Sequence, residues 1–170
     1  MASEPIIRVT PEQWDEQYRS GSWDRLKEFT AHYAIIAALI RKYKCQSILD
    51  LGCGQCILRD FIYNLRAEYF GIDIGIDPPY GIKEDVGTLT PMRQYDCIVF
   101  CESLYYMPEP VFLLQRYLGF ARFSAISISV MPSTAELITW IELQFKVLED
   151  FHLSYGEHEH RIFMLKGKNA

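Results

Sequence analysis

The segment ILDLGCGQC at residues 48–56 most constrains what this chain can fold into. It begins as a compact apolar run, which is typical of a buried strand, and a helical pattern follows it, so its glycines lie in a strand-to-helix turn. Gly52 and Gly54 suit the close approach of a backbone to a bound cofactor. Cys53 and Cys56 have instead the C-x-x-C spacing of a thiol redox pair. The rest of the chain has to decide between these two hypotheses.

Strands and helices are expected to alternate beyond this turn, which predicts an α/β fold. We expect a doubly wound, mostly parallel seven-stranded sheet with an antiparallel last strand, because only a short turn separates the last two strands. Segment 75–83 is too short and too rich in Pro and Gly for a full helix, so the helix between strands 2 and 3 is reduced. The predicted strands are 47–52, 68–74, 82–86, 95–102, 123–130, 146–154 and 160–167, and the predicted helices are 11–19, 25–43, 56–66, 109–122 and 134–145.

The length of 170 residues favours a single domain over 1–170, with 1–24 as an N-terminal arm or lid and 25–170 as the core. The net charge is −5 and no basic run occurs, so we expect no nucleic-acid partner. No apolar run reaches membrane-spanning length, and the first residues do not resemble a signal peptide. Five cysteines without a secretion signal favour reduced thiols and a cytoplasmic location. The sequence leaves the oligomeric state open.

An acidic residue closes the second predicted strand and strengthens the cofactor hypothesis. Asp73 ends the segment YFGID, where a carboxylate can accept the hydroxyls of a ribose. The third glycine of the dinucleotide fingerprint G-x-G-x-x-G would fall at Ile57, so that fingerprint fails. A cofactor with a ribose and no pyrophosphate does not need this glycine, which points to S-adenosylmethionine.

Several segments together resemble the class I S-adenosylmethionine-dependent methyltransferases of the small-molecule type. ILDLGCGQC resembles their motif I, YFGIDI and EDVGTL resemble the second and third motifs, YDCIVFCESLYYMPEP resembles the fourth strand and its loop, and QWDEQYRSGSWD resembles the arm that closes over the cofactor. The resemblance implies S-adenosyl-L-methionine as cofactor, S-adenosyl-L-homocysteine as product and a small-molecule acceptor. It implies a cofactor site formed by Tyr18, Asp50, Gly52, Cys53, Gly54, Asp73, Ile74, Asp85, Val86 and Cys101.

One residue departs from the family pattern within the glycine turn. Cys56 stands where motif I has its last glycine. We expect its side chain to crowd the methionine part of the cofactor and its backbone to require a positive φ.

Glu102, directly after the fourth predicted strand, is the first candidate for a general base, followed by His32 and then by His158. Oxygen is favoured over nitrogen as the acceptor atom, because the N-methyltransferase signature Asn/Asp-Pro-Pro-Tyr is absent at CESLYY. The segment EHEH at 157–160 is interpreted as a solvated strand start. The cysteines lack zinc spacing, and we expect no metal site.

Two alternatives to methyl transfer remain open. One is a methyltransferase fold that binds the cofactor without methylating, or that serves as a partner subunit of another chain. The other is a thiol redox protein that uses Cys53 and Cys56.

Overall fold

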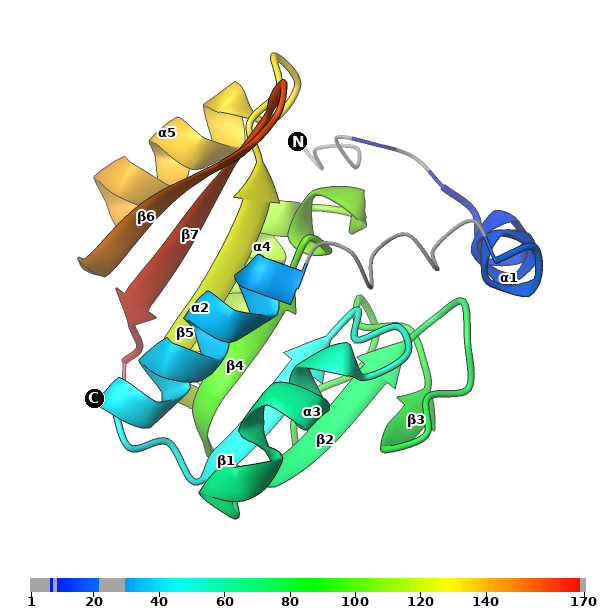
Figure 1. Ribbon diagram of the computed structural model, residues 1–170, viewed down its shortest axis with the longest axis horizontal. Helices are drawn as coiled ribbons and strands as arrows, with labels where there is room; N and C mark the ends of the chain where they lie inside the picture. The colour runs from blue at the N-terminus through cyan, green and yellow to red at the C-terminus, as the bar shows by residue number, and fades with distance from the viewer. Residues whose placement is uncertain (1–6, 8, 22–29, 169–170) are drawn as a thin grey trace.

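The computed structural model describes residues 7, 9–21 and 30–168, and they form one sheet with helices on both faces (Figure 1). The sheet has seven strands in the order β3-β2-β1-β4-β5-β7-β6. Its strands are β1 Ser47–Leu51, β2 Glu68–Asp73, β3 Gly81–Lys83, β4 Tyr95–Cys101, β5 Ala121–Ser129, β6 Val147–Tyr155 and β7 His158–Lys166. The helices are α1 Pro11–Arg19, α2 Thr30–Lys42, α3 Ile57–Ile62, α4 Pro110–Leu118 and α5 Ala135–Gln144, with short 3-10 turns η2 Tyr63–Leu65 and η3 Leu104–Tyr106.

The topology confirms the predicted fold class. β1 pairs in parallel with β2 and β4, β4 pairs in parallel with β5, and β7 runs antiparallel to both β5 and β6. The chain builds the sheet outward from β1 through β2 and β3, then returns to place β4 on the other side of β1. In open sheets of this kind, ligands bind at the carboxyl ends of the strands where the order reverses, here beside β1 and β4.

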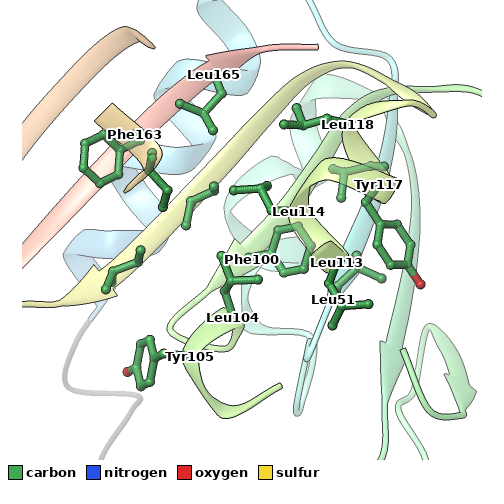
Figure 2. Packing of buried hydrophobic residues seen from close by; sticks show 14 of the residues in the cluster. Leu51, Phe100, Leu104, Tyr105, Leu113, Leu114, Tyr117, Leu118, Phe163 and Leu165 are labelled. Atoms are coloured by element: carbon green, nitrogen blue, oxygen red, sulfur yellow. The ribbon is translucent and has the colours of Figure 1, made fainter. Parts of the chain in front are cut away.

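Alternate residues of the central strands pack into two hydrophobic layers, one on each face of the sheet. In Figure 1, α2 and α3 cover the face nearer the viewer, where Ile36 and Ile40 of α2 pack with Ile48 of β1. The other face packs against η3, α4 and α5, and Figure 2 shows Phe100 of β4 among Leu114 and other side chains of that cluster. Side chains of these two clusters therefore cover both faces of the central strands.

Several element boundaries differ from the predicted ones. The predicted helix 109–122 ends at Leu118, because β5 already begins at Ala121. The predicted helix 56–66 is split into α3 and the 3-10 turn η2. The first residues of the predicted helix 25–43 lie outside the described residues, and the described part is α2. Residues 74–80, which are all described, form turns without a helix, and this confirms the predicted reduction between β2 and β3.

Candidate functional site

A cavity of about 710 Å³ opens at the carboxyl ends of β1, β2, β4 and β5. This volume is within the usual range for small-molecule and cofactor sites. Every site residue predicted from the sequence lines it, with the exception of Asp50. These lining residues are Tyr18, His32, Gly52, Cys53, Gly54, Asp73, Ile74, Asp85, Val86, Cys101 and Glu102.

The glycine turn after β1 forms the floor of the cavity. Gly52 has φ +72° and Gly54 has φ +51°, which are conformations that glycine adopts without strain. A Cβ at Gly52 would lie 2.5 Å from the Cβ of Ser103, and a Cβ at Gly54 would lie 2.9 Å from the hydroxyl of Tyr18. Both the backbone angles and the space therefore require glycine at these positions.

Asp73 at the end of β2 faces this turn from the neighbouring strand. Its carboxylate accepts hydrogen bonds from the backbone amides of Gly54 and Gly75, both at 2.8 Å, and Tyr18 Oη lies 3.5 Å from its Oδ2. Burial raises the pKa of Asp73, and the two amides act against that rise. The hydroxyl of Tyr18 makes the longest of these contacts, so a ribose hydroxyl would replace it as a donor to Oδ2.

Asp85 and Val86 close the side of the cavity next to β3. The carboxylate of Asp85 accepts a hydrogen bond from the amide of Gly87 at 2.7 Å, which fixes one of its oxygens, Oδ1. Asp85 is half-buried and Val86 is buried. This pair provides an apolar wall beside one acceptor, an arrangement that suits a flat polar ring such as adenine.

Asp50 lies beneath the glycine turn and does not line the cavity. It is buried, and its Oδ2 accepts a hydrogen bond from Tyr69 Oη at 2.7 Å. Its Oδ1 has no hydrogen-bond partner among the described residues. Burial raises the pKa of Asp50 to about 7, against the opposing effect of Tyr69. Its predicted contact with a cofactor stays a prediction, and this position favours an indirect role.

Helix α1 supplies part of the cavity wall. Thr10 caps it in a capping box with Gln13, which explains why the polar segment 11–19 is helical. Trp14 and Tyr18 line the cavity, and the ring of Trp14 meets that of Tyr106 edge-on with centroids 5.0 Å apart. A Cβ at Gly75 would lie 2.5 Å from Trp14 Cβ, so the helix contacts the loop after β2 closely.

The thiol of Cys56 lies away from the cavity, which corrects the expectation that it crowds the cofactor. Cys56 is not a lining residue; its Sγ lies 3.7 Å from the Sγ of Cys53, and a Cβ at Gly71 would be 3.1 Å from it. Its φ of +60° shows that the expected left-handed backbone is present. The hydrogen bond between the two thiols lowers the pKa of Cys56 to about 7 and raises that of Cys53. Both thiols are buried.

Glu102 follows β4, on the other side of β1 from Asp73 and Asp85, and several hydroxyls hold its carboxylate there. The backbone of Glu102 has φ +53°, a left-handed conformation that a non-glycine residue adopts at a cost. Tyr105 Oη donates to its Oε2 at 2.7 Å, Ser129 Oγ donates to Oε2 at 2.8 Å, and Ser127 Oγ donates to Oε1. Burial alone would raise the pKa of Glu102, but hydrogen bonds from His160, Ser127 and Tyr105 outweigh it and lower that pKa to about 2.

Two histidines complete this end of the site. His160 Nδ1 lies 3.2 Å from Glu102 Oε1, and His32 Nε2 lies 3.7 Å from the same oxygen. The two imidazole rings meet edge-on, with centroids 4.4 Å apart. His158 lines the cavity but is exposed, whereas the side chain of His152 lies outside the cavity on β6.

His160 is the buried lining residue that the sequence interpretation missed, because EHEH looked like a solvated strand start. His160 is buried, and the register of β7 against β5 places it opposite Ser129. It alternates with Ile162 and Met164, which pack against the α2 side of the sheet. That alternation was a usable signal, because it places His160 on the same side of the sheet as His32.

The charged groups that line the described part of the cavity are acidic. Asp73, Asp85 and Glu102 contribute carboxylates, and no Lys or Arg of the described residues lines it. The cavity therefore favours neutral or cationic ligands over phosphates and carboxylates.

The chain has the fold of the class I S-adenosylmethionine-dependent methyltransferases. Magnesium protoporphyrin IX methyltransferase from Synechocystis, solved with bound S-adenosylmethionine, is similar with a TM-score of 0.68 and 14% identity, over 94% of this chain and 98% of that one. The 1,6-didemethyltoxoflavin-N1-methyltransferase from Burkholderia thailandensis, bound to S-adenosylhomocysteine, has a TM-score of 0.66 and 12% identity, over 94% and 91% of the two chains.

An rRNA methylase from Escherichia coli is also similar, with a TM-score of 0.61 and 17% identity, over 94% of this chain and 78% of that one. No family model and no curated protein matches the sequence. At such low identity the similarity establishes the fold, and the acceptors of these three proteins differ from one another. In the described part of the chain, no helix is long and apolar enough to cross a membrane.

Proposed function

We propose that this protein transfers a methyl group from S-adenosyl-L-methionine to a hydroxyl oxygen of a small molecule. The observation that carries the proposal is the arrangement of one cavity with two different ends. The glycine turn, Asp73 and Asp85 form one end, and Glu102 with two histidines forms the other. The first end has the groups that a nucleoside needs, and the second has the groups that bind and orient a hydroxyl.

The residues present fit S-adenosylmethionine. Gly52 and Gly54 leave room that a side chain would fill, Asp73 would hold the ribose, and Asp85 would face the adenine. When bound, this cofactor supplies an activated methyl group on a sulfonium. Tyr18 and Trp14 cover the same end, so α1 would act as the lid that limits the access of water.

The protein contributes mainly by positioning the acceptor, because a methyl transfer needs the attacking atom in line with the methyl group. Glu102 already accepts hydrogen bonds from Tyr105, Ser127 and Ser129 and contacts His160. Because the pKa of Glu102 is lowered to about 2, its carboxylate is a weak base at neutral pH. We therefore assign it, with His32, to orienting the acceptor hydroxyl rather than to proton transfer.

A small neutral molecule fits the cavity better than a nucleic acid does. The described lining carries three carboxylates and no Lys or Arg, and the whole chain has a net charge of −5. Binding to a phosphate backbone depends on cationic side chains. All five cysteines are free thiols, in agreement with a cytoplasmic protein.

The proposal is tested with S-adenosylmethionine that carries a radioactive methyl group and a panel of small hydroxyl and amine compounds, neutral and anionic. We expect label in neutral hydroxyl compounds. Glu102→Gln should lower kcat/KM by about tenfold to a hundredfold, because removing a charged hydrogen-bond partner costs about 1.5 to 3 kcal/mol. Glu157→Gln, in the exposed turn between β6 and β7, is the matched control and should keep full activity.

Two results would contradict this assignment in different ways. Label in amines alone would refute oxygen as the acceptor atom. Tight S-adenosylhomocysteine binding without transfer to any compound of the panel would favour a cofactor-binding protein that does not methylate.

A further inference from the structure

Three side chains from distant parts of the sequence converge at the end of the cavity beside Glu102, called here the acceptor end in line with the proposed function. His32 comes from α2, Glu102 follows β4, and His160 lies in β7. One nitrogen or oxygen of each lies within 4.8 Å of the others. The side chains of His32, His160 and Glu102 are 3%, 10% and 17% exposed, so all three are shielded from bulk water yet line the cavity.

Their chemistry and spacing match a ligand set for a divalent metal. Two imidazoles and one carboxylate are the donors that zinc, iron, cobalt and manganese sites use when positions are left open for a substrate. With metal–ligand distances of about 2.0 to 2.1 Å, neighbouring ligand atoms lie about 2.9 to 3.4 Å apart. The distances from Glu102 Oε1 to His160 Nδ1 and His32 Nε2 are 3.2 Å and 3.7 Å. All three ligand atoms lie within 4.8 Å of one another, so side-chain rotations that draw them closer would complete the site.

The groups around Glu102 fix its carboxylate by hydrogen bonds, as the residues around a metal site fix the ligands of the metal. Ser127, Ser129 and Tyr105 donate hydrogen bonds to Glu102, and Ser129 also contacts His160 Nδ1 at 3.1 Å. Such hydrogen bonds fix the orientation of ligating side chains and change metal affinity by about tenfold to a hundredfold. The hydroxyls can rotate, so Ser129 is able to release His160 Nδ1 when another partner binds.

The charge balance at this end also favours a cation. Glu102 lies in a sheltered position, and among the described lining residues only the imidazoles of His32 and His160 can act as its cationic partners. A buried carboxylate is normally paired with a cation or coordinates a metal.

We propose that His32, Glu102 and His160 bind one divalent transition-metal ion at the acceptor end of the cavity. The three ligands come from one side and leave coordination positions facing the cavity. If the proposed function holds, the open coordination positions bind an oxygen of the methyl acceptor. The ion would then fix the acceptor and lower the pKa of its hydroxyl, so that the proton passes to water as the methyl group leaves the sulfonium sulfur and bonds to the oxygen, and Glu102 need not act as the base.

The full-length protein, stripped of metal with a chelator and then dialysed, is titrated with ZnCl₂ and MnCl₂ by calorimetry. We expect one ion per chain for at least one of the two metals. A parallel titration with CoCl₂ should produce visible absorption bands from a nitrogen-containing ligand set. His160→Ala and Glu102→Gln should each weaken binding by at least about tenfold.

His152→Ala is the matched control, because the His152 side chain is 71% exposed on β6 and should not affect the affinity. His32→Gln keeps a polar side chain at its position. It tests the second imidazole ligand in case His160→Ala does not fold. Circular dichroism of each metal-free variant shows whether it is folded, and only folded variants are compared.

Absence of saturable binding to the wild type would overturn the proposal, and so would equal affinity of wild type and a folded His160→Ala variant. The same samples are titrated with S-adenosylhomocysteine. Cofactor binding without metal binding would overturn the metal site and leave the proposed function standing. The imidazoles of His32 and His160 would then act without a metal. Metal binding without cofactor binding would support the metal site and refute the proposed function.

Discussion

The carboxylate of Asp73 accepts a hydrogen bond from the backbone amide of Gly54, with 2.8 Å between oxygen and nitrogen. This contact joins the end of β2 to the glycine turn after β1, so the two motifs form a single surface. Tyr18 from α1 reaches the same carboxylate at 3.5 Å. Cofactor affinity should therefore depend on residues from all three segments.

Tyr18→Ala should weaken S-adenosylhomocysteine binding by about three- to tenfold, a loss of up to about 1.4 kcal/mol. The substitution removes the ring that covers Gly54 and lines the cavity. Calorimetric titration measures the effect, with Tyr63→Ala as control, because Tyr63 is 71% exposed on η2. Equal affinities of the Tyr18 variant and wild type would refute a covering role for α1.

Asp50→Asn should stabilise the protein at pH 8 and lose this advantage near pH 4. Burial raises the pKa of Asp50 to about 7 from an ordinary value of 3.8, so the folded state favours the protonated form. Between pH 3.8 and about pH 7 the folded protein holds a proton on Asp50 that the unfolded chain has lost, so the free energy of unfolding of the wild type falls as the pH rises. Above pH 7 the accumulated cost is on the order of 2 to 4 kcal/mol, which the neutral asparagine avoids.

Urea unfolding of Asp50→Asn and wild type from pH 4 to pH 8 measures this difference. Asp60→Asn is the control, because the Asp60 side chain is 78% exposed on α3. Parallel stability curves for wild type and Asp50→Asn would show that Asp50 is not the titrating group.

Cys56→Gly should leave cofactor affinity within about twofold of wild type, because the thiol faces Cys53 and Gly71 and does not line the cavity. Stability receives two opposing effects. Glycine relieves the positive φ at a gain of about 1 kcal/mol, and loss of the buried thiol costs a similar amount. Titration and urea unfolding measure both quantities. Affinity tightened by tenfold would restore the hypothesis that Cys56 crowds the cofactor.

Replacing Cys53 and Cys56 together with Ser should leave methyl transfer within a few-fold of wild type. Their Sγ atoms lie 3.7 Å apart, close enough for the redox hypothesis to be tested, but both cysteines are free thiols. The measurement is methyl transfer by the wild type and the double variant, together with a dithiol-dependent reductase assay. Reductase activity that the double variant lacks would establish redox chemistry instead.

Most of the sheet was predictable because its central strands are buried on both faces and appear as continuous apolar runs. The strand 95–102 and its neighbours are examples. Boundaries were less predictable where tertiary contacts decide them. The helix α4 ends at Leu118, and the chain then turns so that Ala121 can pair with Tyr95 of β4.

The cavity end formed by the glycine turn and Asp73 was predictable from the sequence, and the end formed by Glu102 and the two histidines was predictable only in part. Backbone requirements at Gly52 and Gly54 leave a local signal, and Asp73 follows from its place after a strand. His160 depends on the register that sets it opposite Ser129, which a single sequence does not contain. Asp50 matches a motif, yet the fold places its carboxylate below the turn.

Calorimetric titration of S-adenosyl-L-homocysteine into the wild-type protein tests the central claim, with Asp73→Asn and Asp77→Asn measured alongside. We predict one site per chain and at least about tenfold weaker binding for Asp73→Asn, because charged hydrogen bonds contribute about 1.5 to 3 kcal/mol. Asp77 is exposed in the same loop, so Asp77→Asn should match wild type. No heat and no thermal shift for the wild type at millimolar ligand would contradict the proposal that this cavity binds the methyl donor.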